Sequence, residues 1–188
     1  MKKLTTVFFF LAAATCLYAQ TFSWDIKFLQ GSSQESVAIS RTIRMDTGEN
    51  FLITITPALD CFCYVVLYDS SREIFVLHDR PLRGGATIYL GPFQIEDPPG
   101  TETLYVIIGI ERQTRLEGLI QSFNINGSRV NANNLYREVV TLQNTASGLG
   151  EPASSFIVSG GTSRGSTEEY VTRFSGKDMY VRAITIRH

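Results

Sequence analysis

The side chains that could do chemistry are few in this sequence, and they are scattered along it. His78 and Asp79 are neighbours in "LHDR", but adjacent residues of a strand point to opposite faces, so they cannot orient each other as a dyad. No serine lies in a nucleophile-elbow pattern, and the Gly-rich "SGGTSRGS" lacks the Gly-Lys-Ser/Thr ending of a phosphate-binding loop. We therefore expect no catalytic residues, no cofactor-binding residues and a protein that is not an enzyme.

The residues of metal-ligand type do not form a set either. Cys61 and Cys63, in "DCFCYVVLYD", would share one face of a strand, and that spacing is poorly suited to a disulfide between them. His78 and His188 each stand without further ligands at a suitable spacing. We expect no metal site, and we interpret the two cysteines as small buried apolar side chains.

Glu102 and His78 are the two candidate contacts to a partner. Glu102 lies beside the turn "PPGTE", where its carboxylate is placed to accept hydrogen bonds from a partner or from local backbone donors. His78 lies near the end of a predicted strand. The turn itself is explained by turn chemistry, because Pro99 presets one φ angle and Gly100 supplies the positive φ that a type II turn needs next.

The N-terminal residues have the three parts of a secretory signal, namely two lysines, an apolar segment at residues 7–14 and a small residue at Ala19. We expect cleavage between Ala19 and Gln20, which would place the protein in the periplasm or outside the cell. Attachment of a lipid to Cys16 is the alternative. That processing favours a small residue just before the cysteine, whereas this chain has Thr15.

The charge balance excludes one class of partner. Removal of residues 1–19 takes two of the 17 basic residues and none of the 18 acidic ones, so the remaining chain is acidic. A nucleic-acid-binding protein should carry a clustered basic face, and the sequence shows none. No segment after the signal is apolar over the roughly 20 residues that a transmembrane helix needs. We expect a partner in the cell envelope, either a protein or a surface polymer.

Short apolar segments separated by turn residues occupy positions 24–109. "CFCYVVLY" and "EIFVLH" are apolar on both faces and are joined by the polar turn 69–72, which predicts an antiparallel hairpin of central strands. "NFLITITP" alternates as a half-buried strand does. In "TLYVII", alternation would place Leu104, Val106 and Ile108 on one face and Tyr105 and Ile107 on the other.

Two helices are predicted after these strands. "QTRLEGLIQSFN" combines a capping box of Thr114 and Glu117 with an apolar stripe at helical spacing, formed by Leu116, Leu119, Ile120 and Phe123. A second helix is expected at residues 134–144, and "DMYVRAITIRH" is expected to return to the sheet as a last strand. The sequence therefore predicts a mainly β fold, an antiparallel β-sandwich of immunoglobulin-like or similar type with one or two short packed α-helices.

The stretch "ALDCFCYVVLYDSSREIFVLHD" together with "PPGTETLYVIIG" resembles the bacterial family catalogued as domain of unknown function 4384. The resemblance covers about residues 42–123, and the matching positions are Asp60, Tyr64, Asp69, Leu77, Pro99, Gly100, Thr101 and Glu102. His78 and Asp79 depart from the family, which tends to have Phe-Pro there. The resemblance implies a β-sandwich-like module, often exported or attached to other domains, with no established catalytic residues.

We divide the chain into a signal peptide at 1–19, a β-sandwich domain at 20–125 and a C-terminal extension at 126–188. The extension is expected to hold a helix, a Gly/Ser-rich loop and the final strand. Together these features predict an exported, non-enzymatic envelope protein whose sandwich binds a protein or a surface polymer. The alternative is a hydrolase or other small-molecule enzyme whose site is assembled from dispersed residues.

Overall fold

The computed structural model describes residues 22–146, 154–160, 167–176 and 178–188. The expected signal segment, its cleavage site at Ala19 and Gln20, and Cys16 lie outside these residues. Within them, no helix is both long and apolar enough to cross a bilayer. The elements in chain order are β1 (Phe22–Gln30), β2 (Glu35–Val37), β3 (Ile43–Arg44), β4 (Asn50–Pro57), β5 (Cys61–Tyr68), β6 (Ile74–Leu82), β7 (Ile88–Gln94), β8 (Thr101–Gly109), α1 (Thr114–Ile125), α2 (Arg129–Ala146), β9 (Ser154–Gly160), β10 (Thr167–Gly176) and β11 (Met179–Arg187).

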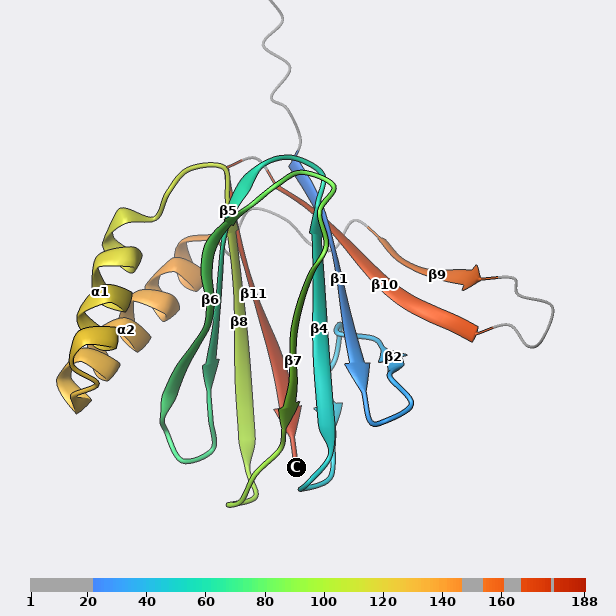
Figure 1. The fold of residues 1–188 in the computed structure, drawn as a ribbon, viewed down its shortest axis with the longest axis horizontal. Helices are drawn as coiled ribbons and strands as arrows, with labels where there is room; N and C mark the ends of the chain where they lie inside the picture. Colours follow the sequence, from blue (N-terminus) through green and yellow to red (C-terminus); the bar gives the residue numbers. More distant parts are fainter. Residues whose placement is uncertain (1–21, 147–153, 161–166, 177) are drawn as a thin grey trace, which may run out of the picture.

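Two sheets form a β-sandwich, and the two helices lie against the second sheet (Figure 1). The first sheet has the strand order β7-β4-β1-β10-β9, with β2 beside β1, and the second has the order β3-β11-β8-β5-β6. The strand pairs of the described residues are antiparallel except β3 with β11. The predicted fold class, a mainly β antiparallel sandwich with helices, is confirmed.

Strict alternation builds the core between the two sheets. Strand β1 buries every second side chain there, namely Phe22, Trp24, Ile26 and Phe28. Strand β8 faces it with Leu104, Val106 and Ile108, and its other face turns Tyr105 and Ile107 toward the helices. The predicted division of β8 between two faces is confirmed, because both faces of the second sheet are covered.

The helices add a second core on the outer face of the second sheet. In α1, Leu116 and Ile120 are buried and Leu119 and Phe123 pack beside them, so the predicted stripe is confirmed. Helix α2 is longer than the predicted 134–144. Its first turn is capped by Ser128, whose Oγ accepts a hydrogen bond from the backbone N–H of Asn131 at 3.3 Å.

The predicted β5–β6 hairpin is present, with pairing from Tyr68 and Ile74 to Cys61 and Leu82. Strand β5 is central, but the prediction of a central β6 is wrong, because β6 ends the second sheet. The helices and the first sheet cover opposite faces of this sheet, so even its edge strand has apolar residues on both faces.

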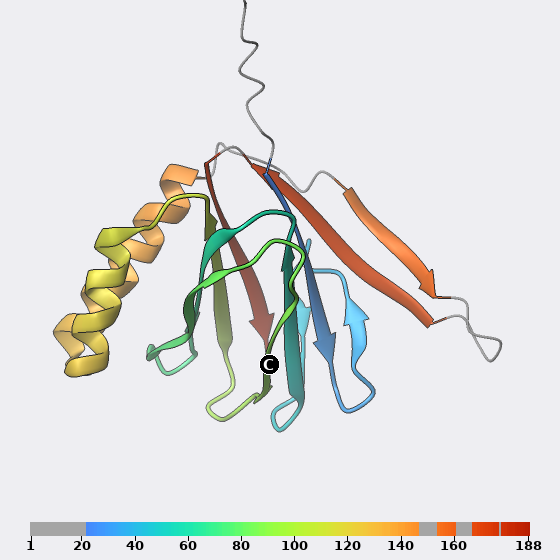
Figure 2. The same cartoon turned by 45° about the horizontal axis from the view of Figure 1, so that its top comes forward.

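The C-terminal third of the chain is integral to both sheets. Strand β10 pairs with β1, and the predicted last strand is present as β11, between β3 and β8. The segment 126–188, expected as an extension, thus also supplies β9 and β10 to the first sheet. Figure 2 shows β9 and β10 as a hairpin that continues the first sheet on the side away from the helices.

The turn before β8 differs from the prediction. Gly100 is not among the glycines with positive φ, so the expected role of Gly100 in a type II turn is wrong. Glycine is required here for a different reason, since a Cβ at this position would lie 2.7 Å from the Cβ of Ser70. The backbone N–H and C=O of Gly100 each pair with His188 at 3.1 Å, which ties the turn to the end of β11.

Candidate functional site: a groove between the β5–β6 hairpin and helix α1

A groove of about 630 Å³ lies between the β5–β6 hairpin and α1. Phe62 and Pro81 stand opposite each other in the β5–β6 ladder and supply an apolar floor. The remaining lining residues are Asp79 of the hairpin and Arg112, Glu117, Ile120, Gln121, Asn124 and Ile125 of the helix side. The groove therefore combines apolar contact area with charged groups of both signs.

A second hollow of about 420 Å³ continues this groove along the hairpin. It shares Phe62 and Pro81 with the first and adds Asp60, Cys61, Leu82, Arg83 and Ile110. The Asp60 carboxylate accepts a hydrogen bond from the backbone N–H of Gly84 at 2.8 Å, which holds the segment after β6 in place. The two hollows thus adjoin along one apolar floor.

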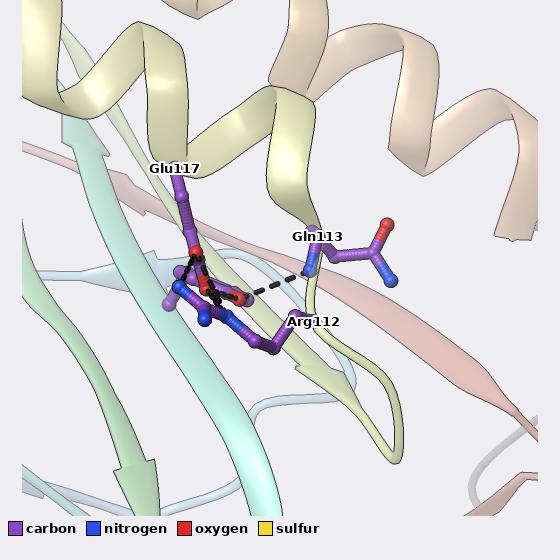
Figure 3. Close-up of polar contacts among 4 residues, drawn as sticks. Arg112, Gln113 and Glu117 are labelled. Atoms are coloured by element: carbon purple, nitrogen blue, oxygen red, sulfur yellow. Dashed lines mark hydrogen bonds and ion pairs between the residues drawn. The ribbon is translucent and has the colours of Figure 1, made fainter.

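A polar cluster positions the start of α1 over β5. Figure 3 shows the side chains of Arg112 and Glu117 meeting below the first turn of the helix, close to the backbone of Gln113. The buried Tyr64 hydroxyl donates to Glu117 Oε1 at 2.6 Å and accepts from the backbone N–H of Gln113 at 3.1 Å. Arg112 donates from Nε to Glu117 Oε2 at 3.1 Å. These bonds link the helix start to the sheet beneath it.

This arrangement overturns the predicted capping box of Thr114 and Glu117. The N-cap residue of α1 is Gln113, which makes no side-chain capping bond. The carboxylate of Glu117 turns instead to Tyr64 and Arg112. A backbone donor at the helix start is satisfied by the Tyr64 hydroxyl, which comes from the sheet and not from the helix itself.

The pKa shifts of Tyr64 and Glu117 favour a structural role for this cluster over a catalytic one. Burial, and next the hydrogen bond to Glu117, raise the pKa of Tyr64 above its ordinary range. Hydrogen bonds from Arg112 and from Tyr64 lower the pKa of Glu117 below its usual value. Near neutral pH the tyrosine is therefore protonated and the glutamate ionised. A general acid or base works best with a pKa near the working pH, and neither group meets that condition.

Apolar surface is exposed at both ends of the groove. Ile125, the last residue of α1, is 79% exposed, and Ile110, just after β8, is 41% exposed. Val130 is similarly exposed, at 67%, but it lies across the α1–α2 turn and does not line the groove. Exposed large apolar side chains beside a hollow are typical of a binding surface.

The predicted site residue His78 does not line this groove, although its neighbour Asp79 does. The half-buried ring of His78 lies on β6 with Nε2 at 3.1 Å from the carbonyl oxygen of Arg80, a bond it makes when Nε2 carries the proton. Burial lowers the pKa of His78. The two neighbours are thus in different surroundings, as strand geometry predicts, and a partner contact from His78 stays a prediction.

The other predicted contact, Glu102, lies inside the fold. It is 6% exposed, and its Oε1 is 3.5 Å from Nε2 of His188, whose side chain is fully buried. Burial raises the pKa of Glu102, and the charge of His188 opposes that rise. The pairing of β8 with β11 brings the two residues together, so no local sequence signal indicates this pair. A partner contact from Glu102 stays a prediction.

Cys61 and Cys63 are free thiols buried in the core between the sheets, in agreement with their interpretation as apolar side chains. Burial raises the pKa of Cys61 to about 11 and that of Cys63 further. Neither thiol is therefore a reactive thiolate near neutral pH. Among the residues that the structure describes, no three His, Cys, Asp or Glu side chains are grouped as a metal site requires.

Sequence reasoning missed the groove because its floor and its wall come from segments far apart in the chain. One local signal was present in Ile125, an apolar residue just beyond the buried stripe of the helix and next to a turn. Comparison with models of protein families, with curated proteins and with solved structures found no match to this chain. The resemblance to domain of unknown function 4384 stays a prediction.

Proposed function

We propose that this protein is an exported, non-enzymatic module of the cell envelope that binds an extended, apolar segment of a partner protein. The binding site is the groove between the β5–β6 hairpin and α1. The observation that carries this proposal is the apolar floor of Phe62 and Pro81, which runs through both hollows and ends in the exposed Ile110 and Ile125.

The form of the groove favours an elongated ligand. Two hollows of about 630 and 420 Å³ adjoin in a row, so that successive apolar side chains of one extended segment would fill them. Extended peptides are commonly recognised in this way, with pockets that take alternate side chains. Burial of Phe62 and Ile125 under such a segment would remove apolar surface from water, which favours binding.

The charged rim of the groove favours one direction of the bound segment. Asp79 lines the first hollow and Arg83 the second, whereas Arg112 and Glu117 already balance each other. A segment with a basic residue near Asp79 and an acidic residue near Arg83 would pair with both. Such complementarity contributes more to specificity and association rate than to affinity.

Export is supported by the N-terminal pattern and by the resemblance to a family whose members are often exported. Intact-mass measurement of the protein from its native host tests this part. We expect a chain that begins at Gln20, in the periplasm or outside the cell. A mass that corresponds to a lipid-modified Cys16 would replace this expectation with a membrane-anchored form.

Peptide selection tests the binding site. The purified protein is used to select from a random peptide library, and the affinity of the selected peptides is measured for wild type, Ile125→Lys and Val130→Lys. Both residues are exposed and flank the same turn, but only Ile125 lines the groove. We expect Ile125→Lys to weaken binding about tenfold or more and Val130→Lys to leave it nearly unchanged. Equal effects of the two variants would exclude the groove.

A hydrolase is the second candidate, because two carboxylates, Asp79 and Glu117, line the same groove. Pairs of carboxylates act as acid and nucleophile or base in glycoside hydrolysis. The lowered pKa of Glu117 and its bonds to Arg112 and Tyr64 oppose the acid role. Panels of glycosidase and esterase substrates distinguish the candidates. A turnover that Asp79→Asn abolishes without loss of folding would replace the binding proposal.

A further inference from the structure

The strands at the ends of the two sheets differ in how well their free edges are protected. In the described chain these end strands are β6 and β3 in the second sheet and β7 and β9 in the first, while the three-residue β2, which pairs with β1 outside this order, is too short to template a further strand. A free edge offers unpaired N–H and C=O groups to any extended chain. Proteins protect such edges with charged residues, prolines, bulges or short strands.

Strand β6 is protected along its second half. Asp79 and Arg80 place charges there, and Pro81 has no backbone N–H to donate. The pairing with β5 also shifts register between Val65 and Val66, and such an irregularity disrupts a regular edge. Addition of another strand along the whole of β6 is therefore disfavoured.

Strands β7 and β3 are protected in other ways. Strand β7 contains Pro92 next to Gly91, whose φ of 113° is outside the range of an extended strand, and its pairing with β4 shifts register between Phe51 and Ile53. Strand β3 consists of the two residues Ile43–Arg44, which is too short to template a further strand.

Strand β9 has none of these protections. Its sequence Ser154–Gly160, "SSFIVSG", contains no charged residue and no proline. It pairs with β10 over all 7 of its residues without a register shift. No strand of the described residues pairs with its other edge. Figure 1 and Figure 2 both place β9 at the outer margin of the first sheet, on the side away from the helices.

We propose that this free edge pairs with the same edge of a second copy of the chain, antiparallel about a two-fold axis at Ile157. The first sheets of the two copies then form one continuous sheet. This pairing places Phe156 of each copy opposite Val158 of the other and Ser155 opposite Ser159. Aromatic residues opposite β-branched ones and paired hydroxyl residues stabilise antiparallel strands, and no like charges meet.

The symmetry of the segment selects a second copy over an unrelated strand. "SFIVS" has hydroxyl residues at its ends, large apolar residues inside them and Ile157 at the centre, so it is nearly the same in type when reversed. A two-fold dimer needs this self-complementarity, because each position of one copy meets its mirror position in the other. The dimer does not depend on the proposed groove, which lies at the far end of the molecule beside α1.

The oligomeric state of the purified full chain tests this proposal. Light scattering after size-exclusion chromatography is applied over a concentration series to wild type, Ile157→Lys and Tyr89→Lys. Tyr89 lies on the edge strand β7 and is 69% exposed, so it is the matched control. We expect wild type and Tyr89→Lys to shift from monomer to dimer as concentration rises and Ile157→Lys to remain a monomer. A monomeric wild type at every concentration, or a dimeric Ile157→Lys, would overturn the proposal.

A cross-linking experiment decides the case in which Ile157→Lys does not fold. Ile157→Cys places one cysteine of each copy on the two-fold axis, at a separation suited to a disulfide. Both variants are made with Cys16 replaced by serine, and Cys61 and Cys63 are buried and do not compete. Under mild oxidation we expect a covalent dimer of Ile157→Cys and none of Tyr89→Cys. The absence of a covalent Ile157→Cys dimer would exclude the proposed axis.

Discussion

The two cores of this protein are built differently. The buried members of the core between the sheets are aliphatic and aromatic side chains together with two free thiols. The core under the helices includes Tyr64 and Tyr105, and a cluster of charged groups links α1 to the sheet beside it. Apolar burial dominates the first core, at whose edge Glu102 lies 3.5 Å from His188, whereas the second core combines apolar burial with directional polar bonds between the helix and the sheet.

This difference has a consequence for function. Apolar contact fixes the distance between layers but not the exact placement of a helix, because many packings of similar area have similar energy. The bonds of Tyr64 to Glu117 and Gln113 specify one placement of α1. One wall of the groove lies on this helix, so the polar cluster determines the shape of the proposed binding site. Tyr64 itself is 1% exposed and does not line the groove.

The largest effect is expected from a change in the core between the sheets. Phe28 is fully buried and stacks on Phe51 with ring centroids 5.1 Å apart. Phe28→Ala should lower the free energy of unfolding by about 3–5 kcal/mol, because it removes apolar contact and leaves a cavity. Chemical denaturation monitored by circular dichroism measures this loss. A loss below about 1 kcal/mol would show that the two sheets are not held together by this core.

A change in the core under the helices should have a slightly smaller and more local effect. Leu116 is fully buried, so Leu116→Ala should cost about 2–5 kcal/mol, whereas the partly exposed Leu119→Ala should cost less. Hydrogen exchange measured by mass spectrometry should show that Leu116→Ala, relative to wild type, accelerates exchange more in α1 than in β1. If neither substitution lowered the free energy of unfolding, the docking of α1 would be contradicted.

Much of this architecture follows from local patterns. The alternation of β8 indicated which of its apolar residues lie on each of its two faces, and the stripe of α1 indicated which helix face packs. Both patterns are local consequences of the period of the backbone. The edge position of β6 could not be predicted in this way, since its apolar residues are explained equally well by a central strand and by an edge strand covered on both faces.

The candidate site was much less predictable than the fold. Glu117 was expected to cap its own helix, but a tyrosine 53 residues earlier in the chain and the preceding Arg112 bind its carboxylate. A capping box and an ion pair at a helix start use the same residue type at the same position, so the sequence does not distinguish them. The shape of the groove also depends on the relative position of β6 and α1, which only the packed fold defines.

A substitution in the turn before β8 tests how firmly this strand, which contributes residues to both cores, is held in place. Gly100→Ala should lower the free energy of unfolding by about 1–3 kcal/mol, because its Cβ would overlap with Ser70. Ser70→Gly removes the atom that is overlapped, so the same substitution made in that background should cost clearly less. A double-mutant cycle of thermal or chemical denaturation measures this coupling. An equal cost in both backgrounds would show that the conformation of Gly100, and not the close approach, requires glycine.

The smallest effects concern two carboxylates, one at each core, whose stability contributions should depend on pH with opposite sign. Glu117 is in the helix layer, and Glu102 lies on the same face of β8 as Leu104, which faces the core between the sheets. The pKa of Glu117 is lowered in the folded protein, so its contribution is present above the ordinary value of about 4.5 and is lost as the pH falls through the folded pKa. The pKa of Glu102 is raised, so its contribution is present in acid and is lost as the pH rises through the folded pKa.

Glu117→Gln and Glu102→Gln remove these titrations with little change of shape. When unfolding free energies are measured from about pH 6 to about pH 3, wild type should lose stability relative to Glu117→Gln and gain stability relative to Glu102→Gln. The same direction of change in both comparisons would contradict the distinction between an ion-paired carboxylate at the helix start and a buried one between the sheets.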